Sequence, residues 1–141
     1  MIFPEPFSPA ALGMNHGALP ITEIKLALTQ DSSDPVTLAA LDAAQKSYAP
    51  YSKSESGVAL RSASGRIYRG SYIENVAFNP SLSPLQVALA ALIAGGEEYS
   101  AIQAVTLVEV HGAKISQRPV TETVLAAIAP DIKLRVFSAG T

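Results

Sequence analysis

The chain has 141 residues, of which 48% are hydrophobic and 16% charged, so it can bury one apolar core and is too apolar for a disordered segment. Its net charge is −2 and it has no basic block, which gives no support to a nucleic-acid-binding surface. The absence of cysteine excludes disulfides, thiolate catalysis and cysteine-ligated metal sites.

Three further absences narrow the class of protein. The only two histidines, His16 and His111, are far apart in the sequence, so no familiar spacing of zinc ligands is present. No apolar run approaches the ~20 residues of a membrane span. The start of the chain lacks both the basic region and the hydrophobic region of a signal peptide. We therefore expect a cytoplasmic protein with no membrane partner.

The first 30 residues are predicted to be a lead-in or linker, followed by one domain over residues 31–141. Four of the ten prolines lie in residues 1–20: Pro4, Pro6, Pro9 and Pro20. Residues 24–29 have the composition of a short strand. The first helix is predicted to begin at Pro35, with Asp34 as its N-cap, and to end before Pro50.

The rest of the chain alternates between strand and helix patterns. Residues 57–61 and 67–72 flank a turn and predict a β-hairpin. Ser83, Pro84 and Gln86 form a capping-box pattern that opens a helix, and Gly95-Gly96 ends it. A buried strand over 101–110, a helix over 119–129 and a strand over 132–137 follow. This order predicts an α/β domain: a mixed sheet, made of the hairpin and crossover strands, with helices on both faces.

Two motifs of the hairpin region resemble the cytidine deaminase family. Residues 48–53 (YAPYSK) with 57–60 (GVAL) are similar to the family's Y-x-P-Y-S-x-[FY]-x-V-G-A-A-L. Residues 70–78 (GSYIENVAF) are similar to its G-x-N-[VI]-E-N-A-S-Y. The resemblance implies the family's three-layer α/β/α fold. It also implies the family's reaction, the hydrolytic deamination of cytidine or deoxycytidine in pyrimidine salvage.

The residues that carry this reaction do not match. In the family, a cysteine or histidine and two further cysteines hold zinc, and a glutamate moves protons. The resemblance places Ser83 at the first ligand, Leu85 at the glutamate, and Arg118 and Thr121 at the cysteine pair. Ser54 stands where the base-stacking aromatic is expected. The asparagine that binds ribose is replaced by Tyr72, whereas the ribose-binding glutamate is retained as Glu74. The resemblance therefore implies no catalytic residue and no metal in this chain.

This pattern is similar to the C-terminal, zinc-free copy found in two-domain, homodimeric cytidine deaminases. The resemblance implies that zinc is held by a separate catalytic domain. It also implies that the partners are a second copy and that catalytic domain, and that the nucleoside is met only through the partner's active site. The residues expected near the partner's site are Glu74, Asn75, Ala77, Phe78, Asn79 and Pro80.

Several alternatives stay open at this point. Ser83 is either a relic ligand or a plain helix N-cap. Glu74 and Asn75 either bind a ribose-like hydroxyl or fix the hairpin exit by hydrogen bonds. The helix over 87–94 is apolar on nearly every side, so it is either fully buried or, as we favour, packs one stripe against another subunit. Finally, the chain could be a free-standing pseudoenzyme that binds a nucleoside or another small ligand in the relic pocket.

Overall fold

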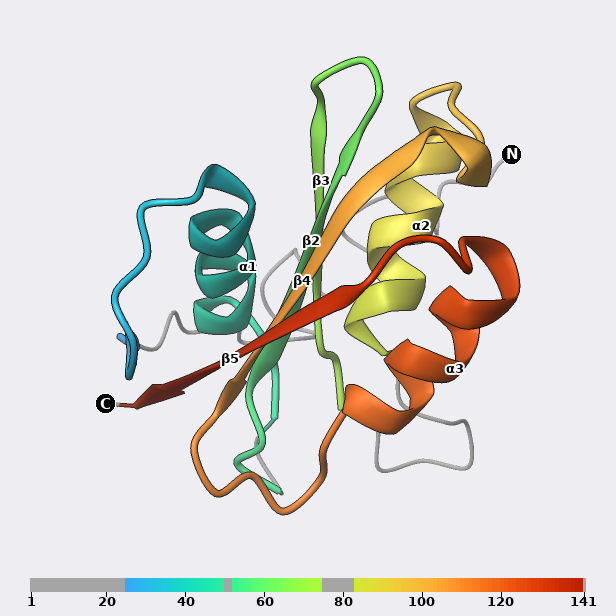
Figure 1. Cartoon of the computed structure of the whole chain (residues 1–141). Helices are drawn as coiled ribbons and strands as arrows, with labels where there is room; N and C mark the ends of the chain where they lie inside the picture. Colours follow the sequence, from blue (N-terminus) through green and yellow to red (C-terminus); the bar gives the residue numbers. More distant parts are fainter. Residues whose placement is uncertain (1–24, 50–51, 75–82, 141) are drawn as a thin grey trace, which may run out of the picture.

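The computed structural model describes residues 25–49, 52–74 and 83–140 and contains one five-stranded sheet flanked by helices. Figure 1 shows α1 on one side of the sheet, and α2 and α3 on the other. The elements are β1 (Ala27–Leu28), α1 (Pro35–Gln45), β2 (Ser56–Ser62), β3 (Ile67–Ser71), α2 (Pro84–Ala94), the short 3-10 turn η2 (Tyr99–Ala101), β4 (Ile102–Val110), α3 (Arg118–Ile128) and β5 (Leu134–Gly140). Both the α/β class and the three-layer arrangement are confirmed.

The sheet is mixed, as predicted, with the strand order β1-β5-β4-β2-β3. The predicted hairpin is β2 and β3, and β2 also pairs antiparallel with β4. The parallel pair β4 and β5 is joined through α3, as a crossover connection requires. Ala27 and Leu28, which lie inside the predicted lead-in of residues 1–30, pair antiparallel with β5 and so belong to the sheet.

Two apolar cores lie on opposite faces of the sheet because side chains alternate along each strand. The core under α2 and α3 contains Val58, Leu60, Val105 and Leu107 from the strands, and Leu85 from α2. The core under α1 contains Ala59 and Val108 from the same strands, with Val36, Ala39, Ala40 and Ala44 from the helix. The alanine-rich side of α1 lets that helix lie close to the sheet.

Local sequence signals set the starts of the first two long helices. The Asp34 carboxylate accepts the Thr37 N–H at 2.9 Å, and Pro35 occupies the first helical position, as predicted. The start of α2 is a complete capping box on Ser83 and Gln86. By contrast, α3 begins at Arg118 without a side-chain cap of its own.

A close approach of backbones fixes α2 on the sheet. A Cβ atom built on Gly70 of β3 would lie 2.0 Å from the Pro84 carbonyl oxygen and 2.6 Å from the Ala88 nitrogen. Only glycine leaves room for this contact. The N-terminal half of α2 therefore lies directly above the outermost strand, β3. Among the described residues, none of the helices is long and apolar enough to cross a membrane.

Candidate functional site

The positions that the resemblance assigns to the metal-binding motif lie at or near the starts of α2 and α3, two helices on the same side of the sheet (Figure 1). Ser83 precedes α2, Arg118 opens α3, and Thr121 lies one turn further on. The two helices contribute to one apolar core, but the side chains at the motif positions have different roles.

Ser83 acts as a helix cap. Its hydroxyl accepts the Gln86 N–H at 3.3 Å, and its own N–H donates to the Gln86 side-chain oxygen at 3.1 Å. The residue is only 8% exposed. Both polar groups of Ser83 are therefore used in capping the N-terminus of α2, which favours the N-cap interpretation over that of a relic ligand.

Leu85 belongs to the apolar core rather than to a polar site. It is 1% exposed and packs in the cluster that contains Val58, Leu60 and Leu125. A hydrocarbon side chain can neither accept nor donate a proton. The position that should move protons in a deaminase is therefore used to stabilise the packing of α2 on the sheet.

The second pair of motif positions is also unsuited to a metal. Arg118 is exposed, and its guanidinium donates to the Glu122 carboxylate one turn along α3 at 3.1 Å. Thr121 is fully buried, and its hydroxyl has no hydrogen-bond partner within the described part of the chain. A cationic side chain and a neutral hydroxyl do not form the anionic or imidazole ligand set that zinc prefers.

The fit of zinc to this chain is therefore poor. Three of the four motif side chains are committed elsewhere, to a helix cap, an apolar core and an ion pair. Over residues 25–49, 52–74 and 83–140, the structure brings no three histidine, aspartate or glutamate side chains together.

Glu74, which the resemblance aligned with a ribose-binding glutamate, lies just beyond β3 and is 8% exposed. Its carboxylate accepts the Ser52 N–H at 3.0 Å, and its own N–H donates to the Tyr48 carbonyl oxygen at 2.8 Å. These bonds join the hairpin exit to the turn after α1, which favours the predicted structural role of Glu74. The remaining residues of the predicted loop, Asn75, Ala77, Phe78, Asn79 and Pro80, lie outside the described residues.

Ser54 and Tyr72 also occupy positions of interest. Ser54 is fully buried, and its hydroxyl accepts the Ile115 N–H from the loop before α3 at 3.0 Å. Tyr72 is 3% exposed, and its N–H donates to the Ser56 carbonyl oxygen at 3.0 Å. The Ser54 side chain thus ties the turn after α1 to the loop before α3.

Two polar residues at this end of the sheet, one buried and one half-buried, were not predicted from the sequence. Ser56 and Glu109 are register partners on β2 and β4, and the Ser56 hydroxyl is buried without a partner in the described residues. The Glu109 carboxylate accepts the Gln117 N–H at 2.6 Å and the Ser116 hydroxyl at 3.0 Å. Glu109 therefore holds the loop that leads into α3. The sequence signal for Glu109 was a carboxylate near the end of a mostly apolar strand.

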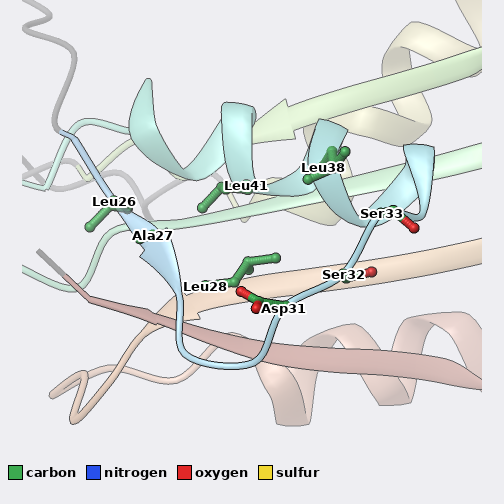
Figure 2. Close-up of a pocket in the computed structure, with 8 residues that line it drawn as sticks. All are labelled: Leu26, Ala27, Leu28, Asp31, Ser32, Ser33, Leu38 and Leu41. Atoms are coloured by element: carbon green, nitrogen blue, oxygen red, sulfur yellow. The ribbon is translucent and has the colours of Figure 1, made fainter.

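A hollow with none of these residues in its lining lies against α1. It has a volume of about 620 Å³ and lies between α1, β1 and the turn that joins them (Figure 2). Its apolar lining comes from Leu26, Leu28, Leu38 and Leu41, and its rim from Asp31, Ser32 and Ser33. None of the predicted site residues lines it, so size alone does not identify the site to which the motifs point.

Comparison with known proteins gives consistent results. The chain matches the family described as the cytidine and deoxycytidylate deaminase zinc-binding region over residues 1–122. A cytidine deaminase of Vibrio cholerae is 46% identical over 136 residues, which cover 96% of this chain and 45% of that protein. One of Vibrio vulnificus is 42% identical over 135 residues, with the same coverage. The chain thus spans less than half the length of these curated relatives.

Solved structures resemble the fold. The crystal structure of cytidine deaminase from Burkholderia pseudomallei matches with a TM-score of 0.64 at 23% identity, covering 79% of this chain and 87% of that one. The structure of the enzyme from Mycobacterium leprae matches with a TM-score of 0.58 at 28% identity, covering 74% and 87%. The mixed sheet with helices on both faces is therefore the fold of these deaminases.

Proposed function

This chain belongs to the cytidine deaminase family, and from that premise we propose that it is a non-catalytic domain of a cytidine deaminase. In this proposal it forms the degenerate C-terminal half of a two-domain, homodimeric enzyme. Its role is to build the assembly and to help close the active site of the partner subunit. The whole enzyme would convert cytidine or deoxycytidine to the uridine product, with zinc in the catalytic domain.

The observation that carries the proposal is the burial of Leu85 in the core at the proton-shuttle position. Attack of water on the base needs a hydroxide, and water is too weak an acid to supply one at neutral pH without a metal. The side chains of Ser83, Arg118 and Thr121 provide no set of ligands for that metal. In this proposal the deaminase scaffold is kept, whereas Ser83 serves as a helix cap and Leu85 as part of the core.

The length of the relatives is consistent with a second domain. The matched region covers 45% of the Vibrio cholerae protein, which leaves more than half of such a protein for another domain. A catalytic deaminase domain of similar size fits into that remainder.

The outer face of α2 supports a role in assembly. Leu85, Ala88, Leu89 and Leu92 face the core, whereas the other side of the helix leaves Ile93 50% exposed, next to the exposed Ala90 and Ala94. An exposed face made of aliphatic side chains is suited to a contact with another subunit. In the proposal this face packs against a subunit, and the loop containing residues 77–80 lies near the partner's pocket.

The test is a co-expression experiment. The chain is produced with the part of the Vibrio cholerae cytidine deaminase that it does not match, and the complex is sized by light scattering. We expect a stable complex that deaminates cytidine, whereas the chain alone does not. The Ile93→Lys variant should weaken the complex, and Val120→Lys, on an equally exposed residue of α3, serves as the matched control. Equal loss with both variants, or no complex with the wild-type chain, would contradict the proposal.

A second candidate function rests on two of the three buried hydroxyls that have no hydrogen-bond partner among the described residues. Ser56 and Thr121 are buried without hydrogen-bond partners among the described residues, at the same end of the sheet as Tyr72 and Glu74. A buried unpaired hydroxyl is costly, so a bound polar ligand would stabilise it. A free-standing pseudoenzyme would bind a nucleoside here. Saturable binding of cytidine in calorimetry, lost in Glu74→Gln but kept in Glu122→Gln, would favour this candidate; no binding would exclude it.

A further inference from the structure

The outer edge of β3 has backbone donors and acceptors that do not pair with β2. β3 is the last strand of the sheet within the described residues. The Tyr72 N–H donates to the Ser56 carbonyl oxygen and the Ser62 N–H to the Arg66 carbonyl oxygen, each at 3.0 Å. Every second residue of an antiparallel strand bonds to the same neighbour, so the backbone groups of Ile67, Arg69 and Ser71 point away from β2. This edge therefore presents donors and acceptors for another strand.

A hollow of about 270 Å³ lies along this edge. Asp42 and Lys46 of α1 and Arg69 of β3 form its charged part, and Ile73 and Val87 contribute apolar surface. The Asp42 carboxylate pairs with Arg69 at 3.1 Å and with Lys46 at 3.3 Å. Two cations thus share one carboxylate, which leaves the rim of the hollow with one excess positive charge.

The position of α2 limits what can occupy the edge. The contact with Gly70 places α2 directly above β3. Paired strands lie about 4.8 Å apart, whereas packed helices need about 8–10 Å between their axes. If two copies paired through β3 about a twofold axis, their α2 helices would be forced too close together. The edge therefore has room for a single extended segment and not for a second copy of this domain.

We propose that the outer edge of β3 binds an extended segment of a partner polypeptide as an added strand, with an acidic side chain of that segment between Lys46 and Arg69. The backbone groups of Ile67, Arg69 and Ser71 provide the hydrogen bonds, and the two cations select the charge. The apolar surface at Ile73 and Val87 receives a neighbouring side chain of the segment. This interaction is independent of whether the chain is catalytic, so its test stands apart from that of the proposed function.

The probe is a short capped peptide of alternating valine and threonine with a central glutamate, added to the isotope-labelled chain. We expect NMR shifts centred on the amides of Ile67, Arg69 and Ser71. A matched peptide with a central lysine should bind about tenfold more weakly, because charge-assisted hydrogen bonds are lost. Shifts centred elsewhere, or equal binding of the two peptides, would overturn the proposal.

The register supplies a sharp variant. Proline at position 69 removes an outward-pointing N–H and leaves the ladder to β2 intact, so Arg69→Pro should fold and lose the peptide. Arg69→Gln keeps the N–H and should bind both peptides with similar affinity. Binding retained by Arg69→Pro would refute the added-strand geometry. If this variant does not fold, amide exchange at Ile67 and Ser71 in the wild-type chain decides: slowing by the glutamate peptide supports the proposal, and unchanged exchange overturns it.

Discussion

Removal of the Ser83 hydroxyl tests whether this position now serves the fold. In Ser83→Ala, the Gln86 N–H loses its acceptor at 3.3 Å, and the reciprocal bond at 3.1 Å loses its fixed geometry. The site is 8% exposed, so water replaces the acceptor poorly. We expect a loss of about 1 kcal/mol of unfolding free energy, within the range of about 0.5–2 kcal/mol known for N-cap removal. For a chain of this size, the midpoint of thermal unfolding should fall by about 3–5 °C.

Urea unfolding followed by circular dichroism measures this loss. Ser83→Asp is the matched control, because a carboxylate caps a helix as well as a hydroxyl does and also interacts favourably with the helix dipole. It should leave the unfolding free energy within about 0.5 kcal/mol of the wild-type value. Gln86→Ala combined with Ser83→Ala should cost less than the sum of the single changes, because the two side chains form one reciprocal unit. An unchanged stability of Ser83→Ala would refute the reasoning that the position is kept as a cap.

Two further predictions concern the packing of the sheet and the start of α1. In Gly70→Ala the new methyl group meets the backbone of α2, so we expect the free energy of unfolding in urea to fall by about 1–3 kcal/mol or more. In the control Gly140→Ala the methyl group meets nothing within 4 Å, so the effect should be small. Similar losses in both variants would contradict the close approach of α2 to β3. Burial raises the pKa of Asp34, but the hydrogen bonds from Thr37 and Arg135 and the charge of Arg135 outweigh it, so the pKa lies below its ordinary value of 3.8. The ionised Asp34 carboxylate therefore stabilises the fold fully when the pH is above the ordinary pKa, and this stabilisation is lost as the pH falls through the lowered pKa of the folded state. Asp34→Asn keeps the helix cap and should remove this dependence of stability on acid pH. Near pH 7 it should cost below about 1 kcal/mol, since the Asp34–Arg135 ion pair is partly exposed. A pH profile of the unfolding midpoint that matches the wild type would contradict the role given to Asp34.

The elements that the sequence predicted well were those whose signals are local. Asp34 with Pro35, and Ser83 with Pro84 and Gln86, carry the cap and the first helical turn within a few residues. The hairpin was equally local, because its two strands are adjacent in the chain. The resemblance to deaminases depended on motifs in the same stretch, and the family match confirms it.

The features that the sequence did not predict depend on contacts between distant segments. Glu97 follows α2 in a polar stretch that is typical of a solvated turn. Its carboxylate accepts a hydrogen bond from the Ser62 hydroxyl at 3.0 Å and another from the Tyr68 hydroxyl. These bonds tie the end of α2 to the hairpin. The Glu109 carboxylate holds the end of the loop before α3 in a similar way. Nothing in the local sequence of either glutamate identifies its partner. The open edge of β3 likewise depends on strand order, which the sequence left undetermined.

The central claim is that the deaminase scaffold of this chain no longer supports the family's zinc-dependent chemistry. The most direct measurement is the zinc content of the purified chain by elemental analysis, with cytidine turnover followed in the same sample. We predict no stoichiometric zinc and no turnover, because Ser83, Leu85, Arg118 and Thr121 supply neither ligands nor a proton shuttle. One zinc ion per chain, together with turnover that a chelator abolishes, would contradict the account.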